Sequence, residues 1–144
     1  MRRYAWTALA LAAAGALLLA AAAFAGGAPE STTLTGAQEV PSADPDGSGT
    51  ATLRLNPGNG TICYELTVSN IATATAAHIH AAPAGVNGPV VVPLVPPAGG
   101  SSTACTSADR SLVLGILKHP ESYYVNVHNA EFPGGAIRGQ LSRP

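Results

Sequence analysis

Two neighbouring segments of the chain alternate apolar with polar residues, and a turn sequence joins them. Residues 50–55 (TATLRL) place an apolar side chain at every second position, and residues 61–68 (TICYELTV) continue the same period. Because successive side chains of a strand point to opposite faces, this period is typical of half-buried strands. The Pro-Gly-Asn-Gly sequence of residues 57–60 is a strong hairpin turn. The pattern therefore predicts an antiparallel hairpin with one apolar face.

Glycine and proline divide the rest of the chain into further short segments. Besides the hairpin, strands are predicted over residues 34–40, 76–81, 90–95, 122–128 and 136–141, with a loop over 96–102. Residues 103–118 leave the strand count open by one or two, and Asp109 could cap a short helix that ends before Pro120. About seven or more short strands separated by turns predict an all-β fold. We expect an antiparallel, Greek-key-like β-sandwich with one possible short helix near residues 109–118.

The N-terminus has the three parts of a secretory signal peptide. Arg2 and Arg3 precede a run of 22 uncharged residues, which closes on the small-x-small sequence Ala23-Phe24-Ala25. We predict a signal peptide over 1–25 that is cleaved near Ala25, a flexible leader over 26–33 and one domain over 34–144, secreted or periplasmic. The apolar run is also long enough for an uncleaved membrane anchor, and that alternative stays open.

Charge is sparse, and its balance excludes one class of partner. The formal net charge is −1, and removal of Arg2 and Arg3 from seven basic side chains leaves five against eight acidic ones, near −3. Such a surface does not attract phosphate, so no charge-driven contact with nucleic acid is expected.

After residue 25 no apolar run approaches the ~18 residues of a membrane-spanning helix. No nucleophile elbow, phosphate loop or dinucleotide fingerprint is present, which favours a non-catalytic role.

The chain contains two cysteines, Cys63 and Cys105, so only one pairing is possible. Outside the cytoplasm such a pair is expected to be oxidised. The sequence contains no Cys-x-x-Cys redox motif. We therefore predict a structural disulfide that closes a loop of about 43 residues.

Histidines are the only candidate chemistry. His78 and His80 lie two apart on the predicted strand 76–81, so both imidazoles point to the same face. On the later strand His128 shares a face with Asn126, opposite two valines. If the two strands are neighbours, His78, His80 and His128 would converge on one ion, and imidazole is a good ligand for copper and zinc. Alternatively, the three histidines only form hydrogen bonds that fix strand ends or loops.

Three other side chains are weaker candidates for this site. His119 would be a fourth ligand, and Glu131 would orient an imidazole from outside the ligand set, although a solvated turn residue is the favoured interpretation. Arg138 lies on the closing strand and could also belong to the surroundings of the site. We expect it to pair with a carboxylate such as Glu39 or Glu65 rather than to bind a substrate.

Five motifs occur along the chain in an order that matches a known domain family. They are LTGAQEVP at 34–41, AHIH at 77–80, GVNGPVV at 85–91, YVNVHN at 124–129 and PGGAIRGQL at 133–141. With these motifs the chain resembles the CHRD (chordin) domain, which occurs repeated in animal chordin and singly in secreted bacterial proteins. The resemblance implies an extracellular β-rich domain whose biochemical activity is poorly defined. We therefore expect a non-catalytic extracellular binding module for an unknown extracellular or envelope protein.

The His-x-His strand is also similar to that of copper–zinc superoxide dismutase, another sandwich protein. In that likeness His128 would be a further copper ligand, and Arg138 would steer the anionic substrate. The chain departs from the pattern, because it has too few histidines for a bridged two-metal site and no matching aspartate for zinc. The alternative function is therefore a copper- or zinc-binding protein, with superoxide dismutase activity as an analogy only.

Overall fold

The computed structural model describes residues 28–143, and the predicted signal peptide lies outside them. The strands are β1 (Ala28–Thr35), β2 (Ser48–Asn56), β3 (Thr61–Ser69), β4 (Ala74–Ala81), β5 (Val90–Leu94), β6 (Ser101–Ser107), β7 (Tyr123–Asn129) and β8 (Ile137–Gln140). One α-helix, α1 (Arg110–Lys118), and two 3₁₀ turns, η1 (Gly36–Gln38) and η2 (Pro120–Ser122), complete the described elements. The prediction of an all-β antiparallel fold with one short helix is confirmed.

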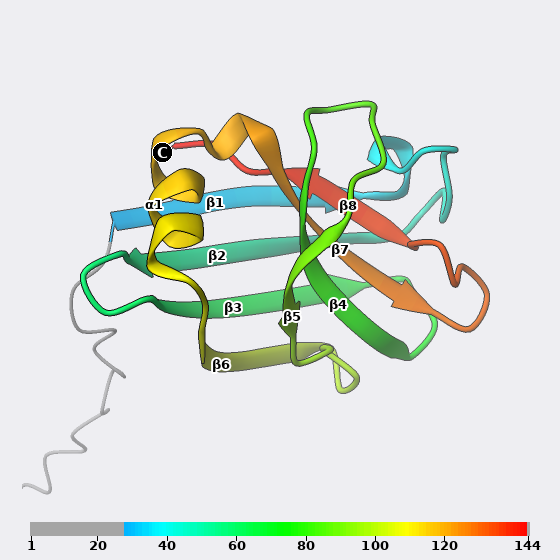
Figure 1. Ribbon diagram of the computed structural model, residues 1–144. Coiled ribbons are helices and arrows are strands. Elements are labelled where there is room, and N and C mark those ends of the chain that lie inside the picture. Colours follow the sequence, from blue (N-terminus) through cyan, green and yellow to red (C-terminus); the bar gives the residue numbers. More distant parts are fainter. Residues whose placement is uncertain (1–27, 144) are drawn as a thin grey trace, which may run out of the picture.

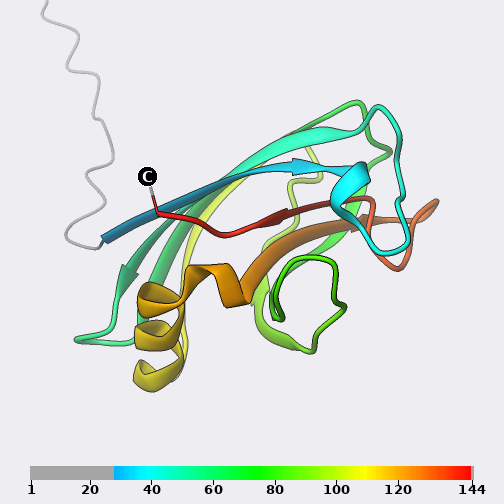
Figure 2. The ribbon, with the colours of Figure 1, turned by 90° about the horizontal axis from the view of Figure 1, so that it is seen from above.

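The eight strands form one antiparallel sheet in the order β5-β4-β7-β8-β1-β2-β3-β6. The sheet curls until its two edges approach each other, which gives a nearly closed, sandwich-like barrel (Figures 1 and 2). Hydrogen bonds connect the two ends: the Val95 amide donates to the Tyr64 hydroxyl at 2.8 Å, and Ser102 Oγ donates to the Val95 carbonyl at 2.8 Å. The curled sheet encloses the apolar core between its two halves.

The predicted hairpin forms as β2 and β3. Leu53 pairs with Tyr64 across it, and both side chains are buried in the core. Residues 57–60 make the turn, with Gly60 at φ +75°, a left-handed conformation that glycine adopts without steric cost. The alternating pattern therefore indicates both the pairing of these strands and their buried face.

The first strand begins earlier than expected. Residues 28–35 form β1 and pair with β2 along its whole length, whereas a strand over 34–40 and a flexible leader over 26–33 were predicted. The prediction was wrong for residues 28–33 because this segment, APESTT, has no apolar alternation. Its backbone hydrogen bonds are made with β2, which lies beside it in the sheet.

Strand β6 was not among the predicted strands. Its sequence, SSTACTS, consists of small residues, and it lies at one edge of the sheet with β3 as its neighbour. Alternate residues of β6 are only half-buried and Ala104 packs against the core, but the side chains on both faces are small, so the period of two carries little signal there. The predicted disulfide is confirmed: Cys63 of β3 and Cys105 of β6 are direct cross-strand partners joined by an S–S bond.

Helix α1 lies against β2 and β3 at one end of the sheet (Figure 1). The Ser111 amide donates to Asp109 Oδ1 at 3.0 Å, which caps the helix as predicted, and the helix ends before Pro120. Val113 and Ile116 of α1 are fully buried in the core. Within residues 28–143, no helix combines the length and the apolar character needed to cross a membrane.

Candidate metal centre

Strands β4 and β7 are antiparallel neighbours, and their register determines the site. His78 is opposite Asn126, and Ala76 is opposite His128. Between the histidines, Ile79 of β4 and its partner Val125 of β7 are fully buried in the core. The three imidazoles therefore lie on the face of the sheet away from the core, close to one another.

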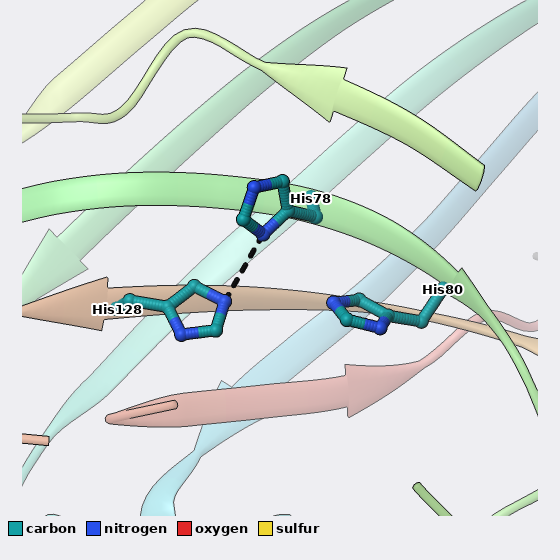
Figure 3. Close-up of side chains that lie close together, drawn as sticks. All are labelled: His78, His80 and His128. Carbon is teal, nitrogen blue, oxygen red and sulfur yellow. Dashed lines mark hydrogen bonds between the residues drawn. The ribbon is translucent and has the colours of Figure 1, made fainter. Parts of the chain in front are cut away.

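The three rings point into one small space (Figure 3). One nitrogen from each of His78, His80 and His128 lies within 4.8 Å of the other two. The shortest contact joins His78 Nδ1 and His128 Nε2 at 3.1 Å. Residues from two strands separated by about fifty positions in sequence thus form one cluster of nitrogen donors.

Backbone carbonyls fix the tautomers of two of these rings. His80 Nδ1 is 2.8 Å from the Gly88 carbonyl oxygen, and His128 Nδ1 is 3.0 Å from that of Pro133. A carbonyl oxygen only accepts hydrogen bonds, so the proton of each neutral ring is held on Nδ1. Nε2 of His80 and Nε2 of His128 consequently carry lone pairs that face the cluster. This is how metal-binding histidines are commonly oriented.

The lone pair on His80 Nε2 has no hydrogen-bond donor, whereas that on His128 Nε2 can accept from His78 Nδ1, 3.1 Å away, when His78 carries its proton there. His80 Nε2 is buried without a hydrogen-bond partner, which is costly for a polar atom. His128 Nε2 lies 3.0 Å from Asn126 Oδ1, an amide oxygen that also accepts rather than donates. Acceptor atoms that face each other in this way are stabilised by a cation placed among them.

Burial keeps two of the rings neutral. It lowers the pKa of His78 below its ordinary value, and His128 and His80 lower it further. Burial is also the main reason why the pKa of His128 is lowered; the bond to Pro133 opposes this, and His80 adds to it. At neutral pH the cluster therefore favours unprotonated imidazole, the form that ligates metals.

The His80 ring packs against an aromatic ring, which in turn contacts a buried guanidinium. The His80 ring stacks on Tyr124 with centroids 4.7 Å apart, and Arg138 Cζ lies 3.8 Å from the Tyr124 centroid. Arg138 donates to Asn87 Oδ1 at 2.8 Å and to the Val86 carbonyl at 3.0 Å. These bonds hold the loop between β4 and β5, which also provides the Gly88 carbonyl for His80.

Arg138 is not placed to steer a substrate. Its side chain is only 2% exposed, and its nearest carboxylate oxygen is Glu39 Oε2 at 4.0 Å. The expected pairing with Glu39 is therefore found, and the alternative partner Glu65 is exposed on β3. The burial of this guanidinium and its bonds to a loop do not fit the steering role that the superoxide dismutase likeness would give it.

Glu39 is a buried carboxyl group behind the cluster. Burial raises its pKa from 4.5 to about 7, against the opposing effects of Arg138, of a hydrogen bond from Asn126 and of the Val40 amide. The same Asn126 faces His128 through Oδ1. One amide thus lies between the histidine cluster and the acidic group.

The raised pKa of Glu39 predicts how stability varies with pH. A carboxyl group with a higher pKa in the folded than in the unfolded state stabilises the fold below pH 4.5, and this contribution is lost as the pH rises through about 7. Relative to Glu39→Gln, the wild type should therefore lose roughly 2–3 kcal/mol of unfolding free energy between about pH 4 and pH 8. Urea denaturation across this range tests it. Glu65→Gln, at an exposed position, is the control, and parallel pH profiles of wild type and Glu39→Gln would contradict it.

The other sequence candidates lie apart from the cluster. His119 follows α1 and pairs with Glu121 at 3.4 Å, and both side chains are about two-thirds exposed. Glu131 is exposed and lines a cleft beside the loop that carries Pro133. Tyr124 and the two carbonyl groups are not among the site residues predicted from the sequence. The period of two did predict that Asn126 shares a face with His128. No sequence signal distinguishes the carbonyl groups of Gly88 and Pro133, because every residue has a carbonyl group.

Comparison with known proteins gives one match. The family model described as CHRD domain matches residues 31–141, which is most of the chain. The matched region contains all three histidines of the cluster and both cysteines of the disulfide. No curated protein and no solved structure matches the chain.

Proposed function

Because the chain belongs to the CHRD domain family, we propose that it is a secreted or periplasmic, non-catalytic binding module whose site takes one copper or zinc ion. The ligands are His78, His80 and His128. The observation that carries this proposal is the buried Nε2 of His80, which has no hydrogen-bond partner and belongs to the cluster of three donor nitrogens. The internal disulfide supports an oxidising location outside the cytoplasm.

The donor set fits the size of these ions. Zn–N bonds of about 2.0–2.1 Å in a tetrahedral site place the ligand nitrogens about 3.4 Å apart. His78 Nδ1 and His128 Nε2 are already 3.1 Å apart, and the whole set lies within 4.8 Å. A small movement of the rings therefore completes a three-ligand site. Its fourth position is left for water or a further ligand.

The chemistry of the ligands favours copper over zinc. Neutral imidazole suits both ions, and for a given set of nitrogen ligands Cu²⁺ binds more tightly than Zn²⁺. The two carbonyl hydrogen bonds, from His80 to Gly88 and from His128 to Pro133, orient the rings before the ion arrives. We expect that pre-orientation to increase the affinity, because less side-chain freedom is lost on binding.

The test is metal analysis of protein recovered after expression of the full chain without a histidine tag, exported into a compartment supplied with copper and zinc. We expect about one equivalent of metal per chain and a thermal shift when the apoprotein is reloaded, because an ion that binds only the native state stabilises it. The variant His78→Ala/His80→Ala/His128→Ala should lose both.

The matched control is His119→Ala, which removes an exposed histidine outside the cluster and should keep the full metal content. Absence of bound metal together with no thermal shift on addition of Cu²⁺ or Zn²⁺ would overturn the proposal. The three histidines would then be structural hydrogen-bonding groups. Equal metal loss in the triple variant and in His119→Ala would indicate surface binding.

A further inference from the structure

A cleft lies beside the histidine cluster, between the segments 39–43 and 131–135. Its volume is about 220 Å³, which is less than the roughly 300–1,000 Å³ of a pocket for a drug-sized ligand. It therefore suits a single side chain. The walls are mostly apolar or backbone, and the charged groups that line the cleft are Glu39 and Glu131.

The two carboxylates differ in exposure. Glu131 is exposed at the rim, whereas the Glu39 side chain is only 4% exposed. Glu39 Oε1 has no hydrogen-bond partner, and the carboxyl group faces Gly135, which also lines the cleft. A side chain at position 135 would collide with this carboxyl group. The glycine thus leaves a buried acceptor at the inner end of an apolar cleft.

Arg138 does not donate a hydrogen bond to Glu39 Oε1. Its Nη1 and Nη2 already donate to Asn87 and Val86, and its closest approach to the carboxylate is 4.0 Å, to Oε2. The cleft consequently has one unpaired buried acceptor and a second negative charge at its entrance. A buried carboxylate oxygen without a donor is unfavourable, and a cation that donates to Oε1 would relieve this cost.

We propose that this cleft binds the ammonium group of a lysine side chain on an extracellular partner protein. The ammonium donates to Glu39 Oε1, Glu131 adds attraction at the rim, and the lysine methylenes pack on Val40 and Phe132. Val40 is 37% exposed, so its side chain is open to such a contact.

The chemistry distinguishes an ammonium from other cations. A guanidinium binds a carboxylate best through two parallel hydrogen bonds, but Oε2 of Glu39 already lies on the Arg138 side. Calcium takes six to eight oxygen ligands, more than the carboxylates of this cleft supply. A compact ammonium at the end of an apolar stem needs only one buried acceptor.

The cleft shares a loop with the histidine cluster without using its ligands. Pro133 lines the cleft, and its carbonyl holds His128 Nδ1 at 3.0 Å. Binding of lysine is therefore separable from binding of the metal. The experiment uses metal-free protein in the presence of a chelator, so that failure of one proposal leaves the other testable.

The probe is Nα-acetyl-lysine-N-methylamide, titrated at pH 8 into ¹⁵N-labelled protein from the full-chain expression. We expect shifts of the Phe132, Gly134 and Gly135 amide signals with a millimolar dissociation constant. Glu39→Gln should weaken binding at least tenfold, and Glu131→Gln two- to threefold. The exposed control Glu65→Gln, on the surface of β3, should leave binding unchanged.

A norleucine analogue of the probe, which has the methylenes but no ammonium, should not bind. Equal binding of this analogue, or unchanged binding to Glu39→Gln, would overturn the proposal, as would binding of n-butylamine without binding of the blocked lysine. If Glu39→Gln loses its native spectrum, Gly135→Ala is a second variant, because its methyl group displaces the carboxyl group. Undiminished binding to Gly135→Ala would then overturn the proposal.

Discussion

Replacement of Arg138 by methionine should lower the free energy of unfolding by about 3–5 kcal/mol at pH 8. The guanidinium is buried at 2% exposure, contacts the Tyr124 ring and donates to Asn87 and Val86. Methionine keeps most of the apolar stem but removes every donor. The loss of stability therefore has three sources. The Val86 carbonyl and the Asn87 side-chain amide lose their hydrogen-bond donor, and the Glu39 carboxylate loses its nearby positive charge.

A double variant separates these contributions. If the carboxylate accounts for part of the loss, Arg138→Met/Glu39→Gln should be more stable than Arg138→Met alone by about 1–2 kcal/mol at pH 8. At about pH 4, where Glu39 is protonated, the two variants should be nearly equal. Urea denaturation at both pH values gives the comparison. A loss of less than 1 kcal/mol for Arg138→Met would contradict the structural role of this side chain.

The same substitution should reduce metal affinity at a distance. Arg138 holds Val86 and Asn87 in the loop that carries the Gly88 carbonyl, and that carbonyl fixes the tautomer of His80. A loosened loop releases the Nδ1 proton of His80 from its acceptor. Loss of such an outer hydrogen bond typically reduces metal affinity 10- to 100-fold. Titration of Cu²⁺ with a competing chelator measures this effect.

Local periodicity predicted the strands that have one face in the core. The alternation in β2 and β3, with the Pro-Gly-Asn-Gly turn between them, determines their pairing and their buried face. Strands β1 and β6 lack this signal, because residues 28–33 and the SSTACTS segment are mostly small or polar. Their positions depend on backbone hydrogen bonding to neighbours, which no local pattern of side chains records.

The candidate site was predictable only in part, for the same reason. The spacing of His78 and His80 implies a shared face, but only the pairing of β4 with β7 places His128 beside them. Strands that pair across more than forty residues have no signal in either segment alone. The carbonyls of Gly88 and Pro133 are still less predictable, since their roles depend on how two loops return to the sheet.

Removal of the disulfide by Cys63→Ala/Cys105→Ala should lower the free energy of unfolding by about 4 kcal/mol. The chain-entropy relation gives this value for a closed loop of about 43 residues, because the unfolded chain gains freedom when the cross-link is absent. The pair lies directly across β3 and β6. Strand β6 is at the sheet edge with β3 as its one neighbour, so we expect the first local opening at β6.

Two measurements check this prediction: urea denaturation of the double alanine variant, and hydrogen exchange of the amides in Ser101–Ser107. The wild type treated with reductant should resemble the variant. The histidine cluster lies on β4 and β7, away from β6 in the sheet order, so metal affinity of the folded variant should stay within about twofold of wild type. A stability loss under 1 kcal/mol would mean that β6 is held mainly by its backbone pairing with β3. A large loss of metal affinity would instead mean that the cross-link orders the closed loop, which includes β4 and its two histidines.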